Sequence, residues 1–283
     1  APVRLPRARG PPHPDDDVIS MGGILRKLWE NENQIVVAYM TSGNIAVFDH
    51  DVTRHLDFVE RAAAALGLEG AAVQRARVTV NAGMEQKAPG DVDIPVVQDL
   101  KRFIRESEAI AALAAVGIPP GAARFLDLPF YQTGEVRKRP LSDDDVAIVL
   151  RLFEDVRPDL VFVAGDLSDP HGTHRTCKAA VEQALARYKA TTRPEVWLYR
   201  GAWQEWSLTE ADVLVPLSQD ELHAKILAIF RHQSQKDTAP FPGYDEREFW
   251  QRVEARNLET AARADRLGLP EYYAMEAYVI QRV

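Results

Sequence analysis

Short apolar runs that alternate with longer helical patterns are the feature that most limits the folds open to this chain. Five such runs are predicted to be strands, at residues 35–40, 125–130, 160–164, 196–199 and 213–217. Most of them lack the alternation of apolar and polar residues that a sheet with one face in solvent requires. We therefore expect strands that are buried on both faces.

Helical periodicity fills the intervals between these runs, at residues 23–30, 52–66, 97–116, 142–156, 171–188, 218–233 and 245–267. Ser142, Ser218 and Asp245 are suitable N-cap residues for three of these helices. The alternation predicts an α/β fold with three layers, Rossmann-like, in which helices cover both faces of a mainly parallel sheet. We expect one domain over residues 1–283, with a surface excursion around residues 83–95, where Gly, Pro and charged residues gather.

Composition excludes several classes of protein. The 283 residues are 46% hydrophobic, which is enough to build a large core, and the formal net charge of -8 argues against a nucleic-acid-binding surface. The single cysteine, Cys177, excludes an intramolecular disulfide framework and is compatible with a reducing compartment. No apolar run approaches the roughly 20 residues that span a bilayer. We therefore expect a cytoplasmic protein with no membrane span.

Two segments far apart in the sequence carry side chains suited to metal chemistry. The first, residues 12–17, contains His13 followed by three aspartates, and the second, residues 169–174, contains His171 and His174. The second segment follows a predicted strand, and its histidines share one face of the next helix because they are spaced i, i+3. The first segment should also follow a strand, but residues 3–12 are rich in Pro and Arg and do not look like a buried central strand.

Together the two segments offer two imidazoles and a carboxylate for one divalent ion, with a further carboxylate and imidazole to spare. Taken alone, each has a simpler interpretation. The aspartates are compatible with a solvated turn that caps a helix, and the histidines with a pair on a helix surface. Their joint occurrence at predicted strand ends favours a metal site.

At these residues the chain resembles the PIG-L/LmbE-like family of zinc-dependent de-N-acetylases, which act on N-acyl amino sugars and related conjugates. The resemblance is carried by the matching motifs His13-Pro14-Asp15-Asp16, Gly22-Gly23, Arg105-x-x-Glu108, His171-x-x-His174 and His232-Gln233-Ser234-Gln235. The sequences of residues 42–51 and 164–175 are most similar to those of the family branch that is fused behind glucosamine-6-phosphate deaminase-like domains in bacteria.

The resemblance implies a role for each matching residue. His13, Asp16 and His174 would bind Zn²⁺, or another divalent metal such as Fe²⁺. Asp15 would take a proton from the attacking water and return it to the leaving amine, and His171 would stabilise the oxyanion.

Arg105 would contact the substrate in the same family pattern. Its simpler alternative is an ion pair within its own helix, with Glu108 or Asp99. The residues 232–235 are interpreted as packing or interface elements, and Cys177 as a small buried thiol.

The resulting expectation is a metal-dependent hydrolase that removes the N-acetyl group from an N-acetylglucosamine-type amino sugar or conjugate. Its partner would be a small-molecule amino sugar, and a homo-oligomer is compatible with the sequence. One alternative is a non-catalytic amino-sugar-binding or regulatory module, favoured if the unusual residues 3–12 displace His13 and leave the metal site incomplete. Another is a non-haem Fe(II) oxygenase, because two histidines and one carboxylate also form a facial triad.

Overall fold

A mixed β-sheet forms the centre of the molecule in the computed structural model, which describes residues 6–88, 90–135, 137–165, 172–189, 191–200, 204–236 and 247–282. Its strand order is β3-β2-β1-β4-β5-β7-β6. The strands are β1 (Pro6–Gly10), β2 (Gln34–Tyr39), β3 (Ala123–Phe125), β4 (Leu160–Ala164), β5 (Glu195–Tyr199), β6 (Val213–Leu217) and β7 (Ala274–Ile280). The strands β1 to β5 pair in parallel, whereas β7 is antiparallel to both β5 and β6. The prediction of a mainly parallel sheet is confirmed.

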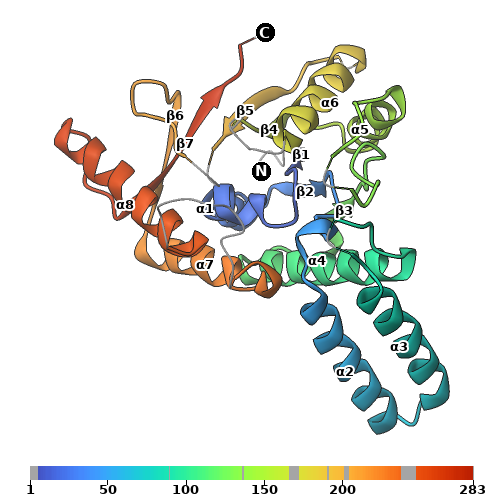
Figure 1. Ribbon diagram of the computed structural model, residues 1–283. Helices are drawn as coiled ribbons and strands as arrows, with labels where there is room; N and C mark the ends of the chain where they lie inside the picture. The colour runs from blue at the N-terminus through green and yellow to red at the C-terminus, as the bar shows by residue number, and fades with distance from the viewer. Residues whose placement is uncertain are drawn as a thin grey trace.

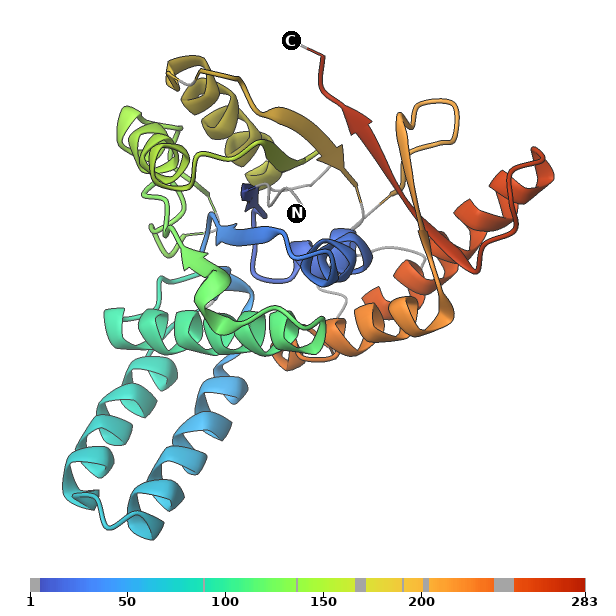
Figure 2. The ribbon, with the colours of Figure 1, turned by 180° about the vertical axis from the view of Figure 1, so that it is seen from behind.

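Helices cover both faces of this sheet, as the two opposite views in Figures 1 and 2 show. The α-helices are α1 (Asp16–Glu30), α2 (Asp49–Ala65), α3 (Gly70–Glu85), α4 (Pro95–Ala115), α5 (Asp143–Val156), α6 (Thr173–Arg187), α7 (Gln219–Ile229) and α8 (Phe249–Arg266). Three short 3-10 turns are η1 (Asn44–Ala46), η2 (Pro120–Ala122) and η3 (Gln233–Gln235). The helices α1, α4, α7 and α8 lie on one face, and α5 and α6 lie on the other. The predicted three-layer α/β fold is therefore confirmed.

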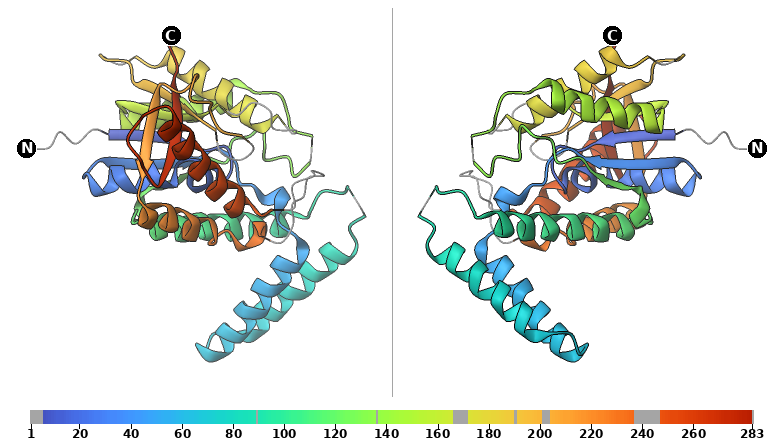
Figure 3. Two further views of the ribbon diagram at one scale, coloured as in Figure 1. Left: turned by 90° about the vertical axis from the view of Figure 1, so that its left-hand side faces the viewer. Right: turned by 90° about the vertical axis from the view of Figure 1, so that its right-hand side faces the viewer.

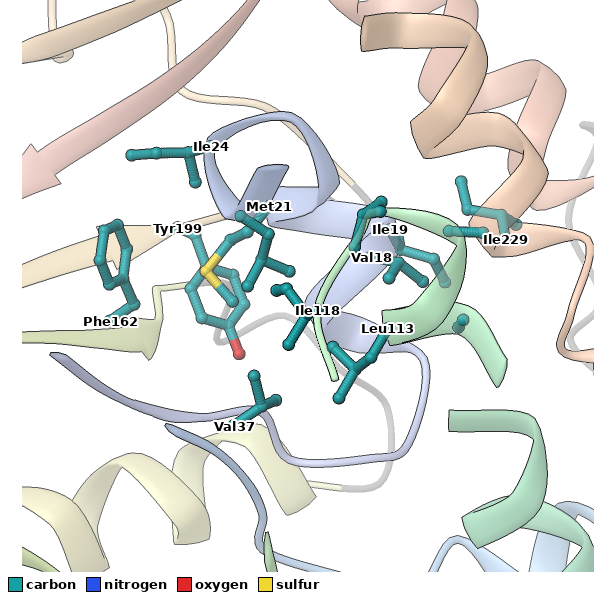
Figure 4. Close-up of a cluster of buried hydrophobic side chains, with 14 of the residues drawn as sticks. Val18, Ile19, Met21, Ile24, Val37, Leu113, Ile118, Phe162, Tyr199 and Ile229 are labelled. Carbon is teal, nitrogen blue, oxygen red and sulfur yellow. The ribbon is translucent and has the colours of Figure 1, made fainter. Parts of the chain in front are cut away.

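Strand β4 explains why the apolar runs show no alternation. Its residues Leu160, Phe162 and Ala164 belong to the core beneath α1, α4 and α7. Val161 and Val163 belong to the core beneath α5 and α6. Figure 4 shows part of the first core, including Phe162 of β4 and Met21 of α1. Because both faces of the strand are buried, every position favours an apolar side chain.

The expectation that residues 3–12 do not form a central strand was wrong. Strand β1 lies between β2 and β4 and pairs in parallel with both. Pro6 is the first residue of the strand, a position at which the missing N–H costs little, and Pro11 and Pro12 follow the strand's end. The prolines therefore bound the strand without interrupting its ladder.

Other boundaries also differ from the predictions; for example, the helix expected at residues 23–30 begins at Asp16. The strand expected at residues 125–130 ends at Phe125, because Asp127 adopts a left-handed conformation with φ of 46° and Pro129 follows. Helix α8 begins at Phe249 with Glu248 as its N-cap, and not at Asp245, which lies outside the described residues.

Helices α2 and α3 form a hairpin that projects away from the sheet, as Figure 3 shows from two sides. A small apolar cluster connects the hairpin to α4, and its buried members are Val47, Val52, Leu56, Val80, Val97 and Ile104. Residues 83–95 contain the last turn of α3, a connecting segment and the first residue of α4. In the part of the chain that the structure describes, no helix combines the length and the apolar character needed to cross a bilayer.

Candidate metal centre and its surroundings

His13, Asp16 and His174 lie together at the carboxyl ends of the central strands. Each offers one ligand atom, and these three atoms lie within 4.8 Å of one another. The Asp16 Oδ2 atom is 3.3 Å from His13 Nδ1 and 3.4 Å from His174 Nε2. The predicted ligand set is thus brought together from two segments that the sequence separates widely.

Strand order produces this arrangement. Strands β1 and β4 are neighbours, so the segments that follow them emerge at the same edge of the sheet. The loop after β1 is held against the end of β2, where Met40 N donates to Pro11 O at 3.0 Å and Thr41 N to Pro12 O at 3.0 Å. The loop then enters α1 at Asp16, and α6 begins at Thr173, which puts His174 in its first turn.

Electrostatics match the preference of these groups for a shared cation. Burial disfavours the charged form of Asp16, but His174 and His13 outweigh it and hold the pKa of this carboxyl well below its usual range. The His13 backbone N–H also donates to Asp16 Oδ2 at 2.9 Å. An ionised carboxylate between two imidazoles is the donor set that divalent transition metals prefer, and three ligands leave positions open for reactants. The residues present therefore fit a catalytic divalent metal.

Asp15, which precedes Asp16 in the sequence, forms an ion pair with Arg105 of α4. The Arg105 Nη2 atom is 3.1 Å from Asp15 Oδ1, and the arginine side chain is only 2% exposed. The carboxylates that the sequence offered as its helical partners are engaged elsewhere, because Asp99 pairs with Arg102 and Glu108 accepts from Ser234. The structure therefore joins α4 to the start of α1 through Arg105.

Arg105 also has hydrogen-bond donors that its ion pair with Asp15 does not use. Its Nε and Nη1 atoms are buried without a hydrogen-bond partner among the residues that the structure describes. Gly43, with φ of 64°, also lies against the guanidinium. A buried guanidinium with open donors is suited to binding an acceptor on a ligand.

The alternative interpretation of the aspartates as a solvated turn does not hold for Asp17. Asp17 is fully buried and accepts a hydrogen bond from Tyr39 Oη at 2.7 Å. Burial raises the pKa of Asp17 to about 7. Asp17 thus anchors α1 to strand β2 and is not one of the three clustered ligand residues. His171, the predicted oxyanion-stabilising residue, lies outside the described residues.

The sequence interpretation missed His232, which follows α7 and borders a pocket beside Asp15. Its imidazole is buried, and burial lowers its pKa well below the usual value, so the ring is neutral. The pocket is lined by Asp15, Ile19, Ile229, Phe230, His232, Gln235, Lys236, Glu248, Phe249 and Trp250. The sequence signal for His232 was the segment His232-Gln233-Ser234-Gln235, which is interpreted above as a packing or interface element.

Comparisons with known proteins agree with this geometry. A family model described as PIG-L, GlcNAc-PI de-N-acetylase, matches residues 11–185, which is more than half of the chain. A relative from Bacteroides thetaiotaomicron, named putative glucosamine-6-phosphate deaminase-like protein, is 46% identical over 276 residues. That match covers 95% of this chain but 41% of the relative, so the chain spans less than half of the relative's length.

Two solved structures share the fold at low sequence identity. The 4-carboxy-2-hydroxymuconate hydratase GalB from Pseudomonas putida has a TM-score of 0.60 and 17% identity, and the alignment covers 98% of this chain and 97% of that one. The N,N'-diacetylchitobiose deacetylase from Pyrococcus horikoshii has a TM-score of 0.58 and 16% identity, over 98% of this chain and 84% of that one. One fold thus serves both a hydratase and a deacetylase.

Proposed function

Because this chain belongs to the PIG-L family of GlcNAc-PI de-N-acetylases, we propose that it is a metal-dependent amide hydrolase acting on an N-acetylglucosamine-type amino sugar or conjugate. The observation that carries the proposal is the meeting of His13, Asp16 and His174, with Asp15 next to Asp16 in the sequence and paired with Arg105. The name of the relative from Bacteroides thetaiotaomicron supports an amino-sugar substrate.

His13, Asp16 and His174 would hold the metal, for which we propose Zn²⁺. A divalent cation bound there supplies the Lewis acidity that activates water and polarises an amide carbonyl. Asp16 serves as a ligand, because its Oδ2 atom faces both imidazoles. The base must therefore be another residue.

Asp15 is the proposed base. Arg105 holds its Oδ1 atom at 3.1 Å, which fixes the carboxylate in one orientation. The carboxylate accepts a proton from the attacking water and delivers it to the nitrogen of the leaving amine. Arg105 uses its remaining donors to bind the substrate, and His171 is proposed to stabilise the oxyanion.

The alternatives are disfavoured for specific reasons. A non-catalytic module required that His13 be displaced, whereas His13 Nδ1 lies 3.3 Å from Asp16 Oδ2. An Fe(II) oxygenase would use the same three ligands but gives no role to Asp15, and it requires molecular oxygen. Amide hydrolysis gives a role to His13, Asp16 and His174 as ligands and to Asp15 as the base.

The test is to assay the purified protein with N-acetylated amino sugars, free and phosphorylated, and to measure release of free amine and acetate. We expect release to stop when a chelator removes the metal and to return with Zn²⁺. Release that continues in the metal-free protein would reject a metal-dependent mechanism. Activity that requires molecular oxygen would favour the oxygenase.

The role of Asp15 is tested separately with Asp15→Ala. We expect at least a roughly 100-fold loss of kcat with the metal content unchanged, since a positioned base contributes about this much. His174→Ala should lose both activity and bound metal. Asp143→Ala is a matched control, because the Asp143 side chain is 85% exposed at the start of α5. Retained activity in Asp15→Ala would show that another group is the base.

A further inference from the structure

The pocket beside Asp15 has no role in the mechanism above. Its volume is about 20 Å³, and it lies between α1, the end of α7 and the start of α8. Its apolar lining residues are Ile19, Ile229, Phe230, Phe249 and Trp250. Figure 4 shows Ile19 of α1 and Ile229 of α7, which supply two of these side chains.

One buried polar side chain in this lining has unused hydrogen-bonding capacity. His232 is 2% exposed, and neither its Nδ1 nor its Nε2 atom has a hydrogen-bond partner among the described residues. Leaving a buried polar group without a partner costs about 1–3 kcal/mol. Such a group is expected where a ligand supplies the missing hydrogen bond.

The position of His232 is fixed by the helix that carries Arg105. Glu108, one turn beyond Arg105 on α4, accepts from Ser234 N at 2.7 Å and from Ser234 Oγ at 2.6 Å. The His232 backbone N–H donates to Ile229 O at 3.1 Å. Helix α4 thus holds both Arg105, at Asp15, and the segment that presents His232.

The chemistry of the lining distinguishes between the two halves of an N-acyl amino sugar. A sugar ring needs hydrogen-bond partners for its hydroxyl groups, and a mainly apolar pocket would leave them unsatisfied. An acyl chain needs only apolar surface to bury. A group bound in this pocket would also adjoin Asp15, which is where the scissile amide must lie.

We propose that this pocket is the subsite for the acyl group of the substrate and that His232 hydrogen-bonds the scissile amide at its Asp15 end. The inference rests on the proposed amide hydrolysis. A volume of about 20 Å³ holds little more than one methyl-sized group, so the subsite fits an acetyl group and limits the length of the acyl chain.

Chain-length preference tests the subsite directly. Glucosamine carrying N-acetyl, N-propionyl, N-butyryl or N-hexanoyl groups is assayed for amine release, and kcat/KM is compared along the series. Ile229→Ala enlarges the pocket and should raise the ratio of kcat/KM for N-butyryl over N-acetyl substrate about 10-fold, since one or two methylenes in an apolar pocket are worth this much.

Ile226→Ala is the matched control. Ile226 lies on the same helix, is 7% exposed against 6% for Ile229, and does not line the pocket. Ile226→Ala should lower the free energy of unfolding about as much as Ile229→Ala and leave the ratio of kcat/KM for N-butyryl over N-acetyl substrate unchanged. Equal ratios in Ile229→Ala, Ile226→Ala and the wild type would overturn the subsite while leaving the hydrolase intact.

His232→Asn tests the polar contact. We expect kcat/KM to fall about 10- to 100-fold for every chain length, with metal content and Tm measured to establish that the site and the fold persist. His223→Asn, on the exposed surface of α7, should behave as the wild type. Unchanged kcat/KM in a folded, metal-loaded His232→Asn protein would overturn the contact. Failure of the wild type to release amine from any member of the series would instead overturn the proposed function, and the subsite with it.

Discussion

At the scale of single residues, Gly43 shows how the lack of a side chain shapes the candidate site. A Cβ atom at this position would lie 3.0 Å from Arg105 Nε and 3.1 Å from Pro14 Cδ, and the backbone φ of 64° is strained for other residues. We expect Gly43→Ala to lower the free energy of unfolding by about 1 kcal/mol or more and to reduce activity at least 10-fold by displacing Arg105.

Gly67→Ala is the control that introduces similar backbone strain without displacing Arg105. Gly67 has nearly the same φ, 68°, but a Cβ there would meet nothing within 4 Å. This variant should lose similar stability in urea unfolding and keep full activity. If both variants lose activity equally, the contact between Gly43 and Arg105 has no role in the site.

The sequence predicted the convergence of His13, Asp16 and His174 better than it predicted their surroundings. The family resemblance implied His13, Asp16 and His174 as ligands, and their two segments could be expected to meet because the carboxyl ends of neighbouring parallel strands lie at one edge of the sheet. Two features of the surroundings depend on how helices pack across the sheet. Asp17 is buried against Tyr39, and His232 lines a pocket. No local pattern encodes such contacts.

At the scale of elements, local signals were reliable where a few neighbouring residues determine the structure. Ser142 and Ser218 were correct N-caps, and each forms a capping box with the acidic residue three positions later. Helix α3 was missed because only its Val80 is buried, so its sequence carries no apolar stripe. Strand β7 was missed because its third residue is Glu276, a charged side chain that is buried and paired with Lys225.

The attachment of the α2–α3 hairpin depends on one cluster of charges. Lys101 of α4 is almost fully buried, and its Nζ atom is 2.7 Å from Asp49 Oδ1 and 2.7 Å from Asp93 Oδ2. Lys87, which follows α3, contacts the same two carboxylates. These contacts connect the start of α2, the end of α3 and the segment that leads into α4.

Lys101→Met should therefore loosen the hairpin without unfolding the rest of the protein. It leaves two carboxylates with a single cation, which we expect to lower the free energy of local opening by about 1–3 kcal/mol. Hydrogen exchange should become faster in residues 49–85 and remain unchanged in α5 and α6. Lys178→Met, which removes a surface pair with Glu182 on α6, is the control. Uniformly faster exchange in Lys101→Met would indicate that the hairpin is not an independent unit.

At the scale of the whole molecule, a buried polar network joins the helix that carries Asp16 to the antiparallel edge of the sheet. Glu276 of β7 accepts from Gly23 N and Ile24 N of α1, each at 2.9 Å, and from Lys225 Nζ of α7 at 2.7 Å. Asn257 of α8 accepts from the same lysine at 3.0 Å. The orientation of α1 is therefore fixed by strand β7, next to the edge strand β6, and this network accounts for a lysine and a glutamate in the core.

Glu205, beside this network, makes the stability of the whole protein depend on pH. Burial raises the pKa of Glu205 from 4.5 to about 7, against the opposing effects of Arg256 and Lys225 and with a smaller contribution from Glu276. Between these two values the folded protein keeps a proton that the unfolded chain has lost. Stability therefore falls as the pH rises from about 5 to about 7 and then levels off, because the folded state binds more protons in that range.

Glu205→Gln removes this titration, and comparison with the wild type isolates it from other groups. The variant and the wild type should be equally stable near pH 5, and the variant should become more stable by about 2 kcal/mol near pH 8, allowing for the partial exposure of the side chain. Urea unfolding at intervals of one pH unit measures the difference. Parallel stability curves across this range would mean that Glu205 ionises in the folded protein as it does in the unfolded chain, and that Arg256 and Lys225 fully offset its burial.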